Sequence, residues 1–553
     1  MQARLLPALV RPDEIRSRLP RQLNWCDVVS YLVEQPVLLL FVLLALGTAL
    51  GNIRVKGISI GPAAVLFVAL GASAIDPELA LSAMIGNVGL ALFAYGVGVM
   101  AGPSFFSSLR TGAKPVALVA STLAAVGGLC WGLGALLGLT PGSIAGLYAG
   151  ANTNTPALAA AVERVGGAPD PTVAYGLTYA GGVIIMLAAA AYALRSAPPE
   201  GGIDEAAPDP IRNATIKVTR DNVLTVRELT YTPYGRVLFS RHQVGDNDIH
   251  VSRGDTLLKT GDRVLVIGPQ RAIDHVVKQL GRLSQIRLDE ERSDVDFRRM
   301  VLSQKQFYGR TIADLELWRK YDARATRVRR ADHDFLATDG FILQAGDRIR
   351  VAAPKERMAD VARYLGDSEH GSSDINPLGL AVGVALGLLL GQLPILIPGL
   401  GTLELGHAAG PLIVGLILGR LQRTGPVVWS LPHQSIEVLN QLGILLFLAY
   451  AGGRAGTAFV DAIQSPLGLK LIAAGVLVTA VHAIALIGIA KWGLRASGQR
   501  IAGYAAASQT QPAVLAFANS ATNHDERVAL GYALVYPVAM VTKIVIAQLL
   551  TLT

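Results

Sequence analysis

Long apolar stretches fill two blocks of the chain, 36–195 and 376–553. In the block between them, 196–375, apolar and polar residues are mixed as in soluble proteins. About 20 apolar residues span a bilayer as a helix, and shorter stretches are typical of broken or buried helices. The pattern therefore predicts two sets of five membrane spans. They lie at about 36–51, 59–75, 85–102, 116–138 and 173–195, and at about 376–393, 406–419, 436–453, 468–490 and 529–551.

Between the fourth and fifth span of each set, amides and hydroxyls stand directly before a proline. Polar side chains and a missing amide donor are costly at bilayer depth, so these segments predict interrupted or re-entrant helices with a function. Their occurrence in both sets predicts a transport site built from an internal repeat. The first motif is Asn152, Thr153, Asn154, Thr155 and Pro156, and the second is Ser508, Gln509, Thr510, Gln511 and Pro512.

The two apolar blocks align with each other. Residues 89–93 match 443–447, and Gly98 and Gly102 then fall on Gly452 and Gly456 without a gap. With five spans per set, the second half must be inverted relative to the first if the soluble block connects them. Basic loops lie on the side of that block, which predicts that it is cytoplasmic.

Composition agrees with a membrane protein. The 553 residues are 51% hydrophobic and 16% charged, against about a quarter charged in soluble chains. The net charge of +8 is spread over loops and the soluble block, so it indicates membrane orientation and no nucleic-acid binding. Two cysteines and no ligand clusters predict no metal and no cofactor, and no signature of an enzyme active site is visible.

The soluble block is also duplicated. Residues 260–266 match 345–351, each with a Gly-Asp turn before an apolar strand and then an amphipathic helix. This pattern predicts two small α+β units, at 210–286 and 287–367. Neither has a glycine-rich dinucleotide fingerprint after a strand.

Three ionisable residues stand out in or beside apolar spans. Arg454 could bind a substrate carboxylate or extend to the membrane surface, and the pattern leaves both open. Lys543 could balance substrate charge or pair with Glu163 or Asp525. His482 is interpreted as a hydrogen-bonded packing residue.

Taken together, the proline motifs, the two inverted halves and the central Gly-Asp tandem resemble the aspartate:alanine exchanger family. The central units look like TrkA C-terminal (RCK-C) domains. The organisation is then an extension at 1–34, transmembrane repeats at 35–196 and 376–553, and the two central units. The resemblance implies a bacterial inner-membrane antiporter, dimeric, working as an elevator on small carboxylates such as aspartate, alanine or a dicarboxylate. The central units would then bind a small regulatory ligand, such as a nucleotide or metabolite, or hold two protomers together.

Two other functions are weighed against exchange. An RCK-regulated ion channel should show a filter-like loop repeated around a pore, and a sodium/proton antiporter should place paired acids in the broken helices. The chain has amides and hydroxyls there instead. Which carboxylate is carried stays open.

Overall fold

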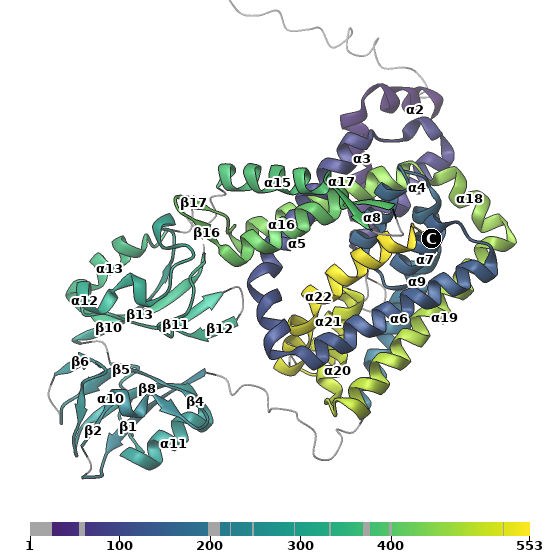
Figure 1. The fold of residues 1–553 in the computed structure, drawn as a ribbon. Coiled ribbons are helices and arrows are strands. Elements are labelled where there is room, and N and C mark those ends of the chain that lie inside the picture. Colours follow the sequence, from purple (N-terminus) through teal and green to yellow (C-terminus); the bar gives the residue numbers. More distant parts are fainter. Residues whose placement is uncertain are drawn as a thin grey trace, which may run out of the picture.

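The computed structural model describes residues 25–54, 61–196, 211–221, 223–245, 248–291, 293–330, 333–344, 346–368, 376–397, 401–523 and 525–552. Two apolar helical halves form one membrane region, and the central α+β units lie beside it (Figure 1). Each of the ten predicted spans is a helix.

The first half is helical throughout its described residues apart from short connections. Its helices are α2 (Trp25–Glu34), α3 (Pro36–Gly51), α4 (Ala63–Ile75), the 3-10 turn η1 (Pro77–Leu79), α5 (Ala83–Thr111), α6 (Ala113–Leu137), α7 (Pro141–Ala151), α8 (Thr155–Arg164) and α9 (Asp170–Arg195).

The second half follows a similar order, with additions. Its elements are α15 (Pro377–Gly391), the hairpin β14 (Pro394–Ile397) and β15 (Gly401–Glu404), α16 (Gly406–Leu421), the hairpin β16 (Arg423–Thr424) and β17 (Val427–Val428), α17 (His433–Gly453), α18 (Gly456–Gln464), α19 (Pro466–Gly488) with the π-turn η5 (Ile489–Gly493), α20 (Gly498–Gln509), α21 (Pro512–Ala521) and α22 (Glu526–Leu550).

The membrane helices pack as two bodies, each built from both halves. In the scaffold body α5 packs against α16 and α17, and α4 packs against α3 and α17. In the core body α7 packs against α9, α20 against α22, and α19 against α9 and α6. The contacts between the bodies are fewer and run mainly through α8 with α16, α5 with α22, and α18 with α19.

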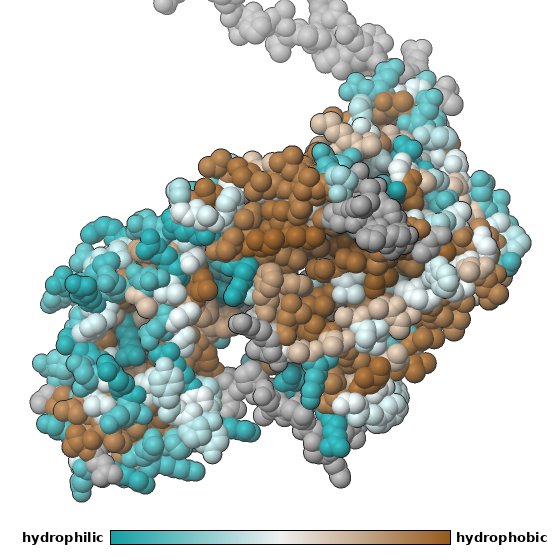
Figure 2. All heavy atoms as spheres, viewed as in Figure 1, coloured by the Kyte–Doolittle hydropathy of each residue, from teal (hydrophilic) through white to brown (hydrophobic). Residues whose placement is uncertain are grey.

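The helical surface is suited to a bilayer. Six described helices are long and apolar enough to cross a membrane, and the bent pair α2 and α3 makes up to seven. The shorter apolar helices include α4, α15 and α16. Apolar side chains cover much of the helical part of the face in Figure 2, whereas the central units are largely hydrophilic there. The chain is therefore a multi-pass membrane protein.

Glycines aligned between the halves occupy reciprocal positions in the scaffold. A Cβ on Gly89 would lie 2.6 Å from the carbonyl oxygen of Gly443, and one on Gly443 would lie 2.5 Å from that of Gly89. Gly98 packs on α16, whereas its counterpart Gly452 packs on α4. Aligned glycines of the two halves thus pack against helices of the opposite half. This is expected where small residues bring membrane helices close together.

This packing makes Gly98 sensitive to any side chain. Its Cβ would lie 2.4 Å from the carbonyl oxygen of Leu412, so Gly98→Val should separate α5 from α16 and destabilise the protein by about 1–3 kcal/mol or more. The matched control is Gly128→Val in α6, because a Cβ there meets nothing within 4 Å. A lower melting temperature for Gly98→Val alone, measured on detergent-solubilised protein, checks the prediction, and equal melting temperatures for the two variants would contradict it.

The central block contains two antiparallel sheets. The first central unit carries β1 (Ile211–Val218), β2 (Leu224–Thr225), α10 (Val226–Leu229), β3 (Tyr231–Thr232), β4 (Gly235–Arg236), β5 (Leu238–Gln243), β6 (Ile249–Val251), β7 (Leu257–Leu258), β8 (Arg263–Pro269), α11 (Gln270–Leu280) and β9 (Gly281–Leu283). The second carries β10 (Val295–Val301), η2 (Lys305–Phe307), η3 (Ala313–Leu315), α12 (Leu317–Tyr321), β11 (Arg324–Arg330), β12 (His333–Leu336), β13 (Arg348–Pro354), η4 (Lys355–Arg357) and α13 (Met358–Leu365).

The two units share a strand order. The first sheet runs β6-β5-β8-β1-β9 and the second runs β12-β11-β13-β10, so four strands correspond. The repeated aspartates close the turn before the matching strands: Asp262 accepts a hydrogen bond from the Lys259 amide at 2.8 Å, and Asp347 accepts one from the Gln344 amide at 2.8 Å. The repeated Gly-Asp pattern is therefore explained by turn geometry.

Some elements differ from the sequence prediction. The segment interpreted as an extension, 1–34, includes helix α2, which meets α3 at 110°, while residues 1–24 lie outside the described part. The second half breaks between α17 and α18, whereas α5 continues as one helix through Pro103. Helix α18 and the β14–β15 hairpin have no counterpart in the predicted span pattern.

Candidate functional site

The two proline motifs interrupt two equivalent helix pairs of the core body. The first half-helices start alike: the Thr140 hydroxyl accepts from the Ser143 amide at the start of α7, and Ser497 accepts from Arg500 at the start of α20. The second half-helices start with a side-chain cap and a proline. Asn154 accepts from the Ala157 amide at 2.7 Å in α8, and Gln511 accepts from the Ala513 amide at 3.3 Å in α21.

A threonine with left-handed backbone makes the break in each pair. Thr153 has φ +46° and Thr510 has φ +52°. Both stand nine residues after the aligned isoleucines, Ile144 and Ile501, so they are equivalent positions. A β-branched residue in this region is an outlier that costs of order 1–3 kcal/mol, and such strain persists mainly at functional sites.

The two breaks meet each other in the core body. The Thr153 hydroxyl donates to the carbonyl oxygen of Gln509 at 2.9 Å, and the Asn154 side-chain amide donates to the Thr510 hydroxyl at 2.9 Å. In return, the Gln509 side-chain amide donates to the carbonyl oxygen of Ala151 at 3.1 Å. Carbonyls at both helix ends are thereby satisfied by the opposite half. We call these five residues and their neighbours in the two motifs the crossing.

Lys543 brings a basic side chain to the crossing. It lies in α22 and is fully buried, and its Nζ donates to the carbonyl oxygen of Ser508 at 2.7 Å and to the Thr510 hydroxyl at 3.0 Å. An ammonium at the C-terminal end of α20 interacts favourably with the helix dipole. No acidic side chain of the described residues forms an ion pair with it.

Two tyrosines of α9 connect to the motifs from one side. The Thr155 hydroxyl and the Tyr175 hydroxyl lie 2.9 Å apart, and Gln511 donates to the Tyr179 hydroxyl at 3.0 Å. The two rings pack with centroids 5.3 Å apart. The first and second motifs are therefore bridged by neighbouring tyrosines one helical turn apart. Tyr175 was not predicted as a site residue, although its four-residue spacing from Tyr179 is visible in the sequence.

The remaining predicted residues differ in their burial and in whether they lie at the crossing. Ser508 is buried and its hydroxyl donates to the Ala505 carbonyl oxygen within α20. Asn152 is buried, and its Oδ1 has no hydrogen-bond partner among the described residues. Pro156 is buried, whereas Pro512 is exposed. The structure does not bring Arg454 to the crossing: it is an exposed residue after α17, beside Gly167, beyond the other end of α8.

The predicted alternative partners of Lys543 are engaged elsewhere. Glu163 accepts hydrogen bonds from the backbone amides of His407 and Ala408 and is paired with the His407 ring. Asp525 is paired with Arg527 at 2.7 Å. Glu163 thus binds donors at the start of α16, and Asp525 binds a donor at the start of α22. Neither pairs with Lys543.

His482 lacks the hydrogen bond that was predicted for it. It is fully buried in α19, but neither ring nitrogen has a hydrogen-bond partner among the described residues. The prediction of a hydrogen-bonded packing residue was therefore wrong for this conformation. Nearby in the same helix, Thr479 donates to the Ala151 carbonyl oxygen at 2.9 Å, so α19 contributes to the crossing in a way that the sequence did not reveal.

Family models match the two membrane blocks of the chain and part of its central block. The chain matches the family Asp-Al_Ex, described as a predicted permease membrane region, over residues 39–195 and 379–552. Residues 298–366 match the TrkA-C domain, which is the second central unit. No solved structure matches the chain.

Full-length relatives are found in several bacteria. An uncharacterized transporter of Geobacter sulfurreducens is 38% identical over 543 residues, covering 95% of this chain and 99% of the relative. One from Cutibacterium acnes is 37% identical over 95% of this chain and 99% of its own, and one from Corynebacterium glutamicum is 35% identical over 95% and 100%. The chain belongs to the Asp-Al_Ex permease family and is a membrane transporter with a TrkA-C domain in its central soluble region.

Proposed function

We propose that this transporter exchanges small carboxylates, such as aspartate for alanine, or a dicarboxylate, at the crossing. The observation that carries the proposal is Lys543, a fully buried lysine without an acidic partner among the described residues. A buried charge is costly unless it is paired, and a substrate carboxylate would supply the missing negative charge.

The surroundings of Lys543 favour an anion over a cation as substrate. The polar groups at the crossing are amides and hydroxyls, and no acidic side chain of the described residues hydrogen-bonds to them. The described residues also contain no cluster of three metal-ligating side chains. This composition does not favour a sodium or proton antiporter, which would need acidic ligands there.

We propose an elevator-type movement, and the two-body packing supports it. The crossing lies within the core body, and the contacts that join that body to the scaffold are fewer than those within either one. A core body that moves against the scaffold would carry the whole site with it and keep its hydrogen bonds intact. The glycine-lined scaffold contacts would stay fixed.

The membrane placement extends the same proposal. The second half would be inverted relative to the first, the central units would lie in the cytoplasm of a bacterial cell, and the protein would sit in its inner membrane as a homodimer. The distribution of basic loops supports the orientation.

Thr155 is expected to affect substrate binding through its hydroxyl. Thr155→Val keeps the shape but loses the contact with Tyr175, which should reduce the affinity for substrate by about 0.5–1.5 kcal/mol or more. Thr155→Ser restores a hydroxyl and should recover most of the affinity. Concentration-dependent uptake into proteoliposomes measures both. If the serine and valine variants transport equally, the hydroxyl has no role in binding.

A ligand-stabilisation experiment tests the proposed substrate class. A ligand that binds only the folded state at 100 times its dissociation constant stabilises it by about 2.7 kcal/mol. Purified protein should therefore melt at a higher temperature with at least one of aspartate, alanine, glutamate or succinate, and not with a diamine of the same length as succinate. Stabilisation by the diamine or by sodium, with no effect of the carboxylates, would argue against the proposal.

A further inference from the structure

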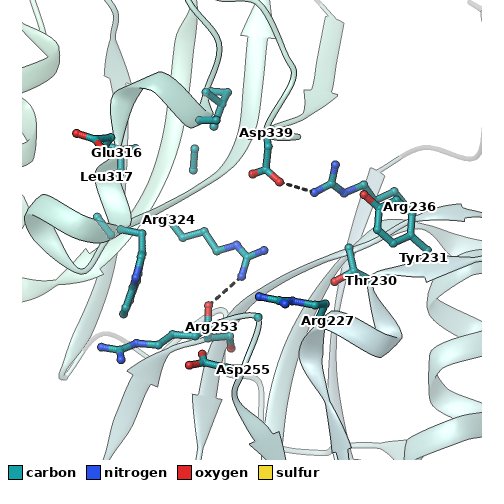
Figure 3. Close-up of a pocket in the computed structure, with 18 residues that line it drawn as sticks. Arg227, Thr230, Tyr231, Arg236, Arg253, Asp255, Glu316, Leu317, Arg324 and Asp339 are labelled. Atoms are coloured by element: carbon teal, nitrogen blue, oxygen red, sulfur yellow. Dashed lines mark hydrogen bonds and ion pairs between the residues drawn. The ribbon is translucent and has the colours of Figure 1, made fainter.

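A cavity of about 650 Å³ lies between the two central units, outside the membrane region (Figure 3). Its size falls within the range of small-molecule sites, roughly 300–1,000 Å³. Four arginines line it: Arg227, Arg236 and Arg253 come from the first central unit, and Arg324 comes from the second. Guanidinium groups present forked donors that match phosphate and carboxylate oxygens.

Contacts across the cavity tie the two central units together. Arg236 pairs with Asp339 at 2.8 Å, and Arg324 donates to the carbonyl oxygen of Ser252 at 2.9 Å. Arg253 stacks over the Trp318 ring at 3.8 Å from its centroid. Because the walls belong to both units, a ligand in the cavity would touch both at once.

Several polar groups of the wall are not fully satisfied. The hydroxyl of Ser252 and Nε of Arg236 are buried and have no hydrogen-bond partner among the described residues. Arg324 is half-buried, and loss of hydration lowers the pKa of its guanidinium from the ordinary value. No ion pair of Arg324 or Arg227 is found within the described residues, and both side chains point toward the same part of the cavity in Figure 3. Unsatisfied donors of this kind favour an acceptor-rich ligand.

We propose that this cavity binds a small organic oxyanion, a phosphate or a carboxylate, with Arg227 and Arg324 as its charge partners. Two of the three acidic residues of the wall are engaged elsewhere, because Asp339 is paired with Arg236, and Glu316 lies 3.5 Å from both Arg319 and Lys320. The third is Asp255, so the four arginines of the wall still outnumber its carboxylates. The site is separate from the crossing and does not depend on what the membrane region carries.

Calorimetric titration of the full-length protein in detergent tests the proposal, with ADP as the phosphate probe and succinate as the carboxylate probe. Arg227→Gln removes one of the two proposed charge partners of the ligand. Arg227 is exposed, so its replacement should not disturb folding. It should weaken the binding of ADP or succinate at this site by ~10-fold or more, and Arg324→Gln should do the same. The matched control is Arg363→Gln, which removes an exposed arginine of α13 outside the cavity and should leave binding unchanged.

The outcomes separate the ligand classes. An arginine-dependent loss of ADP binding identifies a phosphate ligand, and an arginine-dependent loss of succinate binding identifies a carboxylate. Succinate binding that survives both cavity variants belongs to another site. If neither probe shows binding that Arg227→Gln weakens more than Arg363→Gln does, the proposal is wrong.

Discussion

Lys543→Gln should reduce carboxylate transport ~30-fold or more while leaving the protein folded. Removing one member of a buried charge pair typically costs 2–5 kcal/mol or more, and the substrate carboxylate is the proposed second member. Glutamine can still donate to the carbonyl oxygen of Ser508, so the end of α20 keeps a donor. Initial rates of labelled-substrate uptake into proteoliposomes, together with the melting temperature, measure the two effects separately.

Lys470→Gln is the matched control for charge removal. Lys470 is an exposed lysine of α19, so its replacement should leave both transport and melting temperature near the wild-type values. Lys543→Arg keeps the charge but changes its shape, and should retain more transport than Lys543→Gln. Wild-type rates in Lys543→Gln would show that the buried lysine only caps α20.

Cross-linking the core body to the scaffold should abolish transport reversibly. Glu163 at the end of α8 and His407 at the start of α16 are in direct contact, and they belong to different bodies. In a variant with Cys26 and Cys130 replaced, cysteines at 163 and 407 should react with a short bifunctional thiosulfonate and fix the two bodies. Uptake should fall to background and return after reduction.

Two controls make this result specific. The double-cysteine variant without the cross-linker gives the rate to which the treated protein is compared. A second pair, at Asn376 and Val428, lies within the scaffold side, where the Asn376 side chain donates to the Val428 carbonyl oxygen at 3.3 Å. Cross-linking that pair should leave uptake unchanged. Continued exchange by fully cross-linked 163–407 protein would exclude a moving core body.

Much of the fold could be predicted for two reasons. Long apolar stretches are a direct consequence of the membrane environment, and the duplicated motifs mark the same elements in both halves. All ten spans are helices, and the breaks at the two proline motifs coincide with the interruptions α7–α8 and α20–α21. The alignment of Gly89 with Gly443 even located a contact, since these two aligned glycines pack against each other.

The site could be predicted only in part, because hydrogen-bond partners depend on packing between distant segments. Lys543 was found from its charge within an apolar span, yet its partners are the Ser508 carbonyl oxygen and the Thr510 hydroxyl, and not an acid. The role of Tyr175 depends on how α9 packs beside α7 and α21. The cavity between the central units has no sequence signature, because its arginines come from a helix, two strands and a loop of two units.

The most direct measurement of the central claim is counterflow in proteoliposomes loaded with aspartate, alanine, succinate or glutamate. The account predicts that uptake of at least one labelled carboxylate is rapid only when a carboxylate is present inside, and that Lys543→Gln removes this stimulation. A current carried by inorganic ions, with no carboxylate-dependent uptake in any combination, would contradict it.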